Sequence, residues 1–174
     1  MSSPPGGLVV RPAGAHDLPA MLSIWRELMD LHATRDQAFA LAADADERWL
    51  EQAREMLGRE DGFVLAAVVD GEVAGFCLGW VARNPPIYAT PDIGFVSELA
   101  VRRQTQRRGV GRALVAAARA WFTGRGLVEF QLSTAQWNES AHAFWRALGG
   151  RVLLWRYQFP LYASPTPVRP SGHE

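Results

Sequence analysis

The chain has 174 residues, and its 18 arginines balance 18 acidic residues, so the formal net charge is zero. This length favours one compact domain, and the balanced charge argues against a general nucleic-acid or membrane-surface binder. The single cysteine, Cys77, excludes an internal disulfide framework and a cysteine-rich zinc site.

The N-terminal part of the chain predicts a strand and two helices. Residues 1–7 are rich in Pro and Gly without the features of a secretory signal, so we expect a flexible start and a cytoplasmic protein. Leu8–Arg11 predicts a short strand. Apolar residues recur at three- and four-residue steps over 18–32, and again over Asp46–Leu57 before Gly58, which is typical of amphipathic helices.

A hairpin follows these helices. Phe63–Val69 is a β-rich run, Asp70-Gly71 is a favoured two-residue turn, and Glu72–Val81 is the returning strand. The next segment, Arg83–Asp92, contains three prolines and predicts an irregular loop. Ile93–Val101 is rich in branched residues and predicts another strand.

The remaining elements alternate between helix and strand. We expect a basic connection over 102–108, a helix over 109–122, a strand over 128–134, a short helix over 138–148, one or two closing strands over 152–162, and a flexible Pro-rich tail over 163–174. No apolar run reaches the ~18 residues that span a bilayer. An antiparallel hairpin followed by a β-α-β unit predicts an α/β or α+β domain over 8–162, with a mixed sheet.

The neutral total conceals a charge asymmetry. Residues 1–80 hold 13 acidic residues and 6 arginines, whereas residues 81–174 hold 5 acidic residues and 12 arginines. Within 102–125 there are seven arginines and no acidic residue. This division suggests one anionic and one cationic partner, and a solvated basic face is the alternative.

The most informative motif lies in Glu98–Leu114, where a strand leads through a basic loop into a helix. Gly109 and Gly111 let the backbone approach a ligand closely, and amides at the start of a helix bind anions. No Gly-Lys-Ser/Thr follows, so the loop is not a Walker A motif, and the third glycine of a dinucleotide fingerprint is missing. The motif therefore predicts a site for a pyrophosphate.

These features resemble the GNAT superfamily of acyl-CoA-dependent N-acetyltransferases over about residues 8–160. The family's Leu-x-Val strand end corresponds to Leu99-Ala100-Val101, and its Gln/Arg-x-x-Gly-x-Gly/Ala motif to Gln106–Gly111. Its Asn-x-x-Ala-x-x-Phe-Tyr helix corresponds to Asn138–Trp145, and the hairpin VVDGEVAGF is typical in position. The resemblance implies a GNAT-like, mostly antiparallel sheet of six to seven strands with helices on both faces.

The resemblance also implies the residues that bind acetyl-CoA as co-substrate, with no metal. The main chain of Leu99 and Val101 would pair with the pantetheine arm, and the Val101 amide would polarise the thioester carbonyl. The amides of residues 107–112 would hold the pyrophosphate. The whole expected set is Leu99, Ala100, Val101, Gln106, Arg107, Arg108, Gly109, Val110, Gly111, Arg112, Asn138, Ala141 and Phe144.

Transfer to an amine needs a base, and Glu98 is the candidate. Strand alternation places Glu98 and Ala100 on one face and Leu99 and Val101 on the other. The alternative for Glu98 is an exposed strand glutamate or a partner of an arginine. His32 and Asp36 are candidates for the acceptor side, although His32 fits the packed face of its helix, and His142 is expected at the surface.

Trp145 departs from the family pattern, which has a tyrosine able to protonate the leaving thiolate. An indole has no such proton, so the thiolate leaves unassisted or through water, or another group serves. The substitutes that we consider are Ser140, Tyr157 and Tyr88. Ile87 and Tyr88, with Trp25, Trp49 and Trp80, suggest a partly aromatic acceptor pocket, and core packing explains the tryptophans equally well.

The leading hypothesis is therefore an N-acetyltransferase that moves an acetyl group from acetyl-CoA to a primary amine by direct attack. The acceptor is a small molecule or a protein amine, and relatives are often homodimers. The alternative is a non-catalytic CoA-binding sensor, favoured by Trp145. A nucleic-acid binder using the arginine cluster is a third hypothesis, which the neutral charge disfavours.

Overall fold

The computed structural model describes residues 7–161. The chain divides into two compact units, Met1–Ser133 and Thr134–Glu174. The first unit contains the sheet and three of the helices, and the second contains one further helix within its described part. The flexible ends expected at 1–7 and 163–174 lie outside the described residues, except for Gly7.

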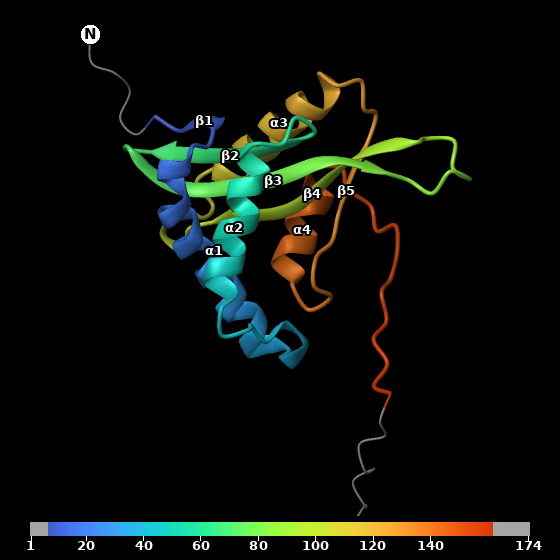
Figure 1. Ribbon diagram of the computed structural model, residues 1–174, viewed down its shortest axis with the longest axis horizontal. Coiled ribbons are helices and arrows are strands. Elements are labelled where there is room, and N and C mark those ends of the chain that lie inside the picture. Colours follow the sequence, from blue (N-terminus) through green and yellow to red (C-terminus); the bar gives the residue numbers. More distant parts are fainter. Residues whose placement is uncertain (1–6, 162–174) are drawn as a thin grey trace, which may run out of the picture. The chain divides into compact units, whose positions relative to one another are not determined.

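The sheet of the first unit has five strands in the order β1-β2-β3-β4-β5 (Figure 1). Their bounds are β1 Val9–Pro12, β2 Gly62–Val69, β3 Glu72–Arg83, β4 Asp92–Val101 and β5 Phe130–Leu132. The first three pairs are antiparallel, and β4 and β5 are parallel. The expectation of a mixed, mostly antiparallel sheet is therefore confirmed.

Helices cover both faces of this sheet. Helix α1, Leu18–Arg35, and helix α2, Ala45–Leu57, pack on a core that includes Val64 and Phe76 of the sheet. Helix α3, Val110–Thr123, packs on the opposite core, which includes Leu65 and Cys77. Neighbouring residues along β2 and β3 therefore belong to different cores, as the alternation of side chains in a strand requires.

Residues 7–161 contain five strands, so the six to seven expected are not confirmed. The predicted strand at 128–134 contracts to Phe130–Leu132, and residues 151–161 contain no strand and are exposed. Strand-type residues such as Trp155 and Phe159 form a strand only when another strand satisfies their backbone groups. The closing strands predicted over 152–162 are therefore wrong for the part of that segment that the structure describes.

Glycine determines how closely the start of α3 approaches the sheet. A Cβ at Gly75 of β3 would lie 2.8 Å from the carbonyl oxygen of Ala100 and 3.1 Å from the Val110 side chain. Only a residue without a side chain permits this contact. Gly75 thus allows the start of α3 to pack beside the end of β4. The predicted Asp70-Gly71 turn is present as well, with both residues at positive φ.

The second unit contains helix α4, Glu139–Ala147, close to the predicted range. The Asn138 side chain caps it by accepting a hydrogen bond from the Ala141 N–H at 3.1 Å. At the other end, Gly149 has a positive φ and the Gly150 N–H donates to the carbonyl of Trp145. This is the glycine ending that the sequence predicts.

An ion pair between a buried carboxylate and a partly exposed guanidinium joins β1 to the turn before α1. Asp17, only 3% exposed, accepts two hydrogen bonds from the Arg11 guanidinium, at 2.7 and 2.8 Å, and one from the Gly14 N–H at 2.8 Å. The Arg11 hydrogen bonds are the main reason why the pKa of Asp17 lies below its usual value. The pair is therefore stabilising wherever Asp17 is ionised.

We expect Asp17→Ala to lower the free energy of unfolding at neutral pH by about 2 kcal/mol. A broken buried pair costs ~3–5 kcal/mol, and Arg11 reduces this loss because it reaches solvent in the variant. The carboxyl has a lower pKa in the folded state, so its contribution is present above the ordinary Asp value near ~4 and is lost as the pH falls through the folded pKa.

Urea unfolding at pH 7 and at pH 3 measures this effect. Asp61→Ala is the matched control, because Asp61 forms a similar two-bond pair with Arg59 on the exposed surface. Equal losses for Asp17→Ala and Asp61→Ala would contradict the importance of burial.

Candidate active site

Strand β4 has an edge that is only partly paired. Its parallel ladder with β5 begins at Gly94 and ends at Val96, which faces Leu132. β4 continues to Val101, while its register with β3 shifts between Val96 and Glu98. Ser97 has no partner in that register, so it forms a bulge, which bends a strand and increases its twist. Within the first unit, the last residues of β4 therefore have a free edge on the side of β5 (Figure 1).

Backbone groups of two predicted residues face this free edge. The Arg102 N–H donates to the Ala74 carbonyl of β3 at 2.8 Å. The backbone of Arg102 therefore faces β3. Because N–H and C=O directions alternate along a strand, the backbone groups of Leu99 and Val101 point away from β3. The Gln106 side chain donates to the Val101 carbonyl at 3.2 Å. Ala100 instead faces β3 with its backbone, and its side chain lies in the core beside α1 and α2.

The loop before α3 presents a second set of free backbone groups. Arg107 and Gly109 both have positive φ, of 62° and 86°, so the chain turns sharply between them. Successive N–H groups in such a turn face one side and bind anions. Helix α3 then starts at Val110, and its first bond runs from the Ala113 N–H to the Gly109 carbonyl. The amides of residues 110–112 have no acceptor within the helix.

The chemistry of this second region suits an anion. The positive end of the α3 dipole lies at the same place, and Arg107, Arg108 and Arg112 are exposed around it. Val110 itself is buried among residues of the α3 core, so only its backbone is available to a ligand. The predicted residues Gln106–Arg112 are therefore gathered at the end of β4.

Glu98 lies on the opposite face of β4 from Leu99, as predicted. Its Oε2 accepts a hydrogen bond from Nε1 of Trp49 on α2, at 3.0 Å. Trp49 stacks on Trp25 of α1, with ring centroids 5.5 Å apart, and both side chains are buried. Glu98 is thus neither an exposed strand residue nor the partner of an arginine.

Burial raises the pKa of Glu98 above its ordinary value, and the Trp49 hydrogen bond opposes part of this rise. A carboxylate with a raised pKa accepts a proton more readily near neutral pH than an exposed glutamate does. The environment therefore suits a general base. The sequence suggests Trp49 only for the acceptor pocket or the core, because only the folded chain brings it to Glu98, 49 residues away.

We expect Trp49→Phe to shift the acidic limb of the pH–rate profile to higher pH. The variant keeps an aromatic ring beside Trp25 but loses the donor that lowers the pKa of Glu98. Rates measured from pH 5 to 9 at saturating substrate test this. Trp121→Phe on α3 is the control, since its indole packs on Phe63 in the other core. If the acidic limb of Trp49→Phe lies at the same pH as that of the wild type, the indole has no role in setting the pKa of Glu98.

Other candidates lie in different surroundings. His32 is half-buried, with Nδ1 2.8 Å from the Leu28 carbonyl oxygen and its ring edge on Phe39, so it is packed as expected. Asp36 is exposed and accepts a hydrogen bond from the Ala38 N–H. Trp25 and Trp49 belong to the core, whereas Ile87 and Tyr88 are exposed in the loop between β3 and β4.

The remaining predicted residues belong to the second unit. Asn138 caps α4 and also accepts a hydrogen bond from Ser140 at 3.0 Å. Phe144 contacts Trp145 edge to face, and Tyr157 is exposed. The contribution of Asn138, Ala141 and Phe144 to CoA binding stays a prediction, as does the choice of a proton donor.

A free strand edge next to a helix start that suits an anion, with a partly buried carboxylate on the same strand, is the arrangement expected of an acyltransferase that takes its acyl group from a phosphate-bearing carrier. Residues 25–149 match the profile of the acetyltransferase (GNAT) family. The chain belongs to this family. It is an enzyme that transfers an acetyl group to an amine, and its relatives do not support the sensor alternative.

Named relatives include two kinds of acetyltransferase. The chain is 32% identical over 133 residues to an aminoglycoside N(6')-acetyltransferase type 1 of Stenotrophomonas maltophilia, covering 75% of this chain and 80% of that protein. It is 33% identical over 109 residues to a mycothiol acetyltransferase of Pseudarthrobacter chlorophenolicus, covering 63% of this chain but 31% of that protein.

A solved structure has the same fold. The aminoglycoside N-acetyltransferase AAC(6')-Iy, in complex with CoA, superposes with a TM-score of 0.72 at 20% identity. The match covers 91% of this chain and 100% of that one.

Among the described residues, no helix is both long and apolar enough to cross a membrane.

Proposed function

We propose that the protein transfers the acetyl group of acetyl-CoA directly to a small-molecule amine. The observation that carries this proposal is the free edge of β4 beyond Val96, which is followed, after a turn at Arg103–Thr105, by the amides of residues 107–112. A molecule with an extended amide-bearing arm and a diphosphate matches both features. The CoA complex of the AAC(6')-Iy structure supports acetyl-CoA as the carrier.

The pantetheine arm would extend the sheet at Leu99 and Val101. This mode of binding, in which a ligand adds a strand to a free edge, uses backbone hydrogen bonds. An amide of the arm would replace the Gln106 side chain at the Val101 carbonyl. The Val101 N–H would donate to the thioester oxygen, where negative charge develops during attack. The amides of 107–112 would bind the diphosphate.

Glu98 would act as the base for the attacking amine, directly or through a water molecule. The amine nitrogen forms a bond to the thioester carbon, the carbon–sulfur bond breaks, and the amine proton passes to Glu98. The CoA thiolate leaves with the bonding electrons and takes a proton from water. A thiol with a pKa near ~8.5 is a fair leaving group, so the absence of a tyrosine at Trp145 is compatible with turnover.

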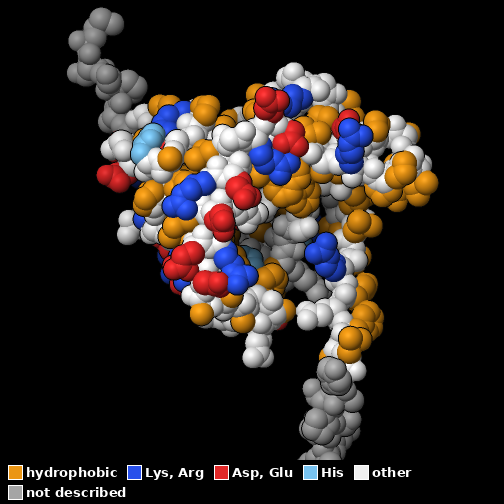
Figure 2. All heavy atoms as spheres, in the orientation of Figure 1, with side chains coloured by type: hydrophobic (Ala, Val, Ile, Leu, Met, Phe, Trp, Pro, Cys, Tyr) orange, Lys and Arg blue, Asp and Glu red, His pale blue; other side chains and the backbone are white. Residues whose placement is uncertain are grey.

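The acceptor is proposed to be cationic. The Glu98 face of the sheet is covered by α1 and α2, where acidic side chains lie among arginines (Figure 2). These helices and their connection carry Glu27, Asp30, Asp36, Asp44, Asp46, Glu47, Glu51 and Glu55. A relative whose name specifies an aminoglycoside as its acceptor supports a small-molecule amine over a protein.

Thiol release from acetyl-CoA with a panel of amines tests the proposal. The panel includes polyamines, aminoglycosides, neutral amines, amines bearing carboxylates and an N-terminal peptide, each at graded ionic strength. We expect turnover with cationic small molecules that weakens as salt increases. Binding of CoA without any turnover would contradict the proposal that the protein transfers the acetyl group. A preference for anionic acceptors would contradict the proposal that the acceptor is cationic.

We also propose that residues 8–162 act as one catalytic domain, with Asn138, Ala141 and Phe144 along the pantetheine. Asn138→Ala would lose the side chain that caps α4, so any change in CoA binding would include the effect of a less stable helix. Phe144→Leu isolates the aromatic contact instead. A rise in KM for acetyl-CoA in Phe144→Leu supports this placement, and an unchanged KM contradicts it.

A further inference from the structure

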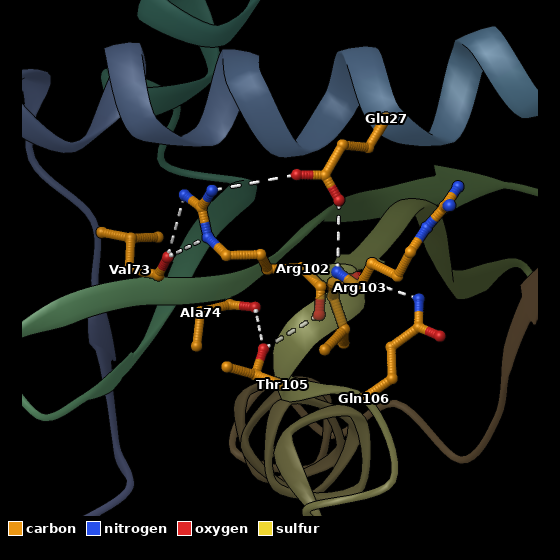
Figure 3. A network of polar contacts seen from close by, with 8 residues as sticks. Glu27, Val73, Ala74, Arg102, Arg103, Thr105 and Gln106 are labelled. Atoms are coloured by element: carbon orange, nitrogen blue, oxygen red, sulfur yellow. Dashed lines mark hydrogen bonds and ion pairs between the residues drawn. The ribbon is translucent and has the colours of Figure 1, made fainter.

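The basic segment after β4 begins with two residues that contact helix α1. Oε2 of Glu27 accepts a hydrogen bond from the Arg103 N–H at 3.2 Å, and Oε1 lies 3.8 Å from Nη1 of Arg102 (Figure 3). The contact joins positions 76 residues apart. It brings an acidic side chain to a segment, 102–125, that contains seven arginines and no acidic residue.

Strand β3 holds Arg102 and Thr105 from the other side. The Arg102 guanidinium lies 3.4 and 3.5 Å from the Val73 carbonyl oxygen, and the Arg102 N–H donates to Ala74 at 2.8 Å. Thr105 Oγ1 is within hydrogen-bond distance of the Ala74 and Arg102 carbonyls (Figure 3). The start of the segment is therefore held between α1 and β3, shortly before the exposed residues 106–109.

We propose that Glu27 is a positioning residue for acetyl-CoA, an inference that rests on the function proposed above. Its carboxylate keeps Arg102 and Arg103 in one arrangement, so that the amides that follow are already directed at the diphosphate. A binding loop that is ordered in advance loses less entropy when the ligand binds. The Glu27 side chain is 38% exposed, so the ion pair contributes little to folding and its effect falls on ligand binding.

A purely electrostatic role predicts the opposite result. Glu27 is an anion near a site for an anion, so its charge alone repels the diphosphate. Removing it would then tighten CoA binding. If Glu27 instead positions the loop, its removal weakens binding, and the direction of the change separates the two roles.

Calorimetry with CoA and steady-state kinetics test the proposal on three variants. Glu27→Ala removes both contacts, and we expect Kd and KM for acetyl-CoA to rise about tenfold with kcat within about twofold. Glu27→Gln keeps an oxygen that accepts from Arg103, so its Kd should rise only about twofold. Asp30→Ala removes a charge from the exposed side of the same helix and should leave Kd unchanged. Hydrogen exchange of the 102–109 amides should accelerate in Glu27→Ala only.

Two outcomes would overturn the positioning role: a Kd of Glu27→Ala equal to that of Asp30→Ala, or tighter than that of the wild type. Failure of the proposed function has a different signature. In that case the wild type does not bind CoA, or it binds CoA as weakly as a Gly109→Asp variant, which places a carboxylate among the amides proposed to bind the diphosphate. Thermal unfolding confirms that each compared sample is folded at the assay temperature.

Discussion

Replacing Gly109 by aspartate should greatly weaken CoA binding while leaving the fold largely intact. Gly109 has φ of 86°, and no heavy atom lies within 4 Å of a Cβ built there. Asp tolerates the left-handed region better than most residues do, and the position is exposed. The new carboxylate would lie among the amides proposed to bind the diphosphate. Two unit charges 4 Å apart near a protein surface repel by roughly 4 kcal/mol before salt screening, so we expect CoA affinity to fall by about 10²-fold or more.

Gly109→Asn is the matched control for this variant. It has nearly the same shape and the same tolerance for positive φ but no charge. Calorimetry at low and moderate salt should show a small loss for Gly109→Asn and a large, salt-sensitive loss for Gly109→Asp. Unchanged affinity in Gly109→Asp would show that the diphosphate binds elsewhere. Equal losses in both variants would mean that backbone strain, rather than charge, prevents binding.

Replacing Glu98 by glutamine should reduce kcat by about 10²-fold at neutral pH, the usual range for loss of a general base. The glutamine amide keeps an oxygen that accepts from Trp49, so the packing around it survives. The loss should become smaller at high pH, because a larger fraction of the amine is then already neutral. Rates from pH 6 to 10 at saturating substrates measure this, and a wild-type pH profile in Glu98→Gln would remove Glu98 as the base.

The same variant should be more stable than the wild type at neutral pH. The pKa of Glu98 is higher in the folded state than in the unfolded state because of burial. Ionisation of Glu98 therefore costs no stability below its pKa in the unfolded state, ~4.3. The free energy of unfolding falls as the pH rises from that value through the pKa in the folded state. Glutamine does not ionise, so we expect Glu98→Gln to unfold at higher urea than the wild type at pH 7 and at similar urea at pH 4. A less stable variant at pH 7 would contradict the burial of an ionisable carboxylate.

Stability and function therefore conflict at Glu98. A desolvated carboxylate at Glu98 destabilises the fold once it is ionised, whereas the base role proposed for Glu98 favours a raised pKa. Trp49 moderates this conflict because its indole N–H stabilises the ionised form. The effects of Trp49→Phe and Glu98→Gln on the pH–rate profile are for this reason not expected to be additive.

Much of the fold and part of the site follow from local patterns in the chain. The steps of apolar residues in α1, the turn at Asp70-Gly71 and the glycines around α3 act over a few residues, so they are readable without a structure. The division of Glu98 and Leu99 between two faces of β4 follows from the period of a strand. The resemblance to an acyltransferase family also depends on such short motifs.

Contacts between distant parts of the chain determine the remaining features. The length of the β4–β5 ladder depends on where two strands diverge, which no local run of residues specifies, and the exposed segment 151–161 lacks the partner that a strand needs. The partial burial of Glu98, its bond to Trp49 and the contact of Glu27 with Arg103 likewise arise only when helices pack on the sheet. Hydrogen bonding and desolvation act through space, and so the folded chain alone decided the environment of the proposed base and the shape of the proposed anion site.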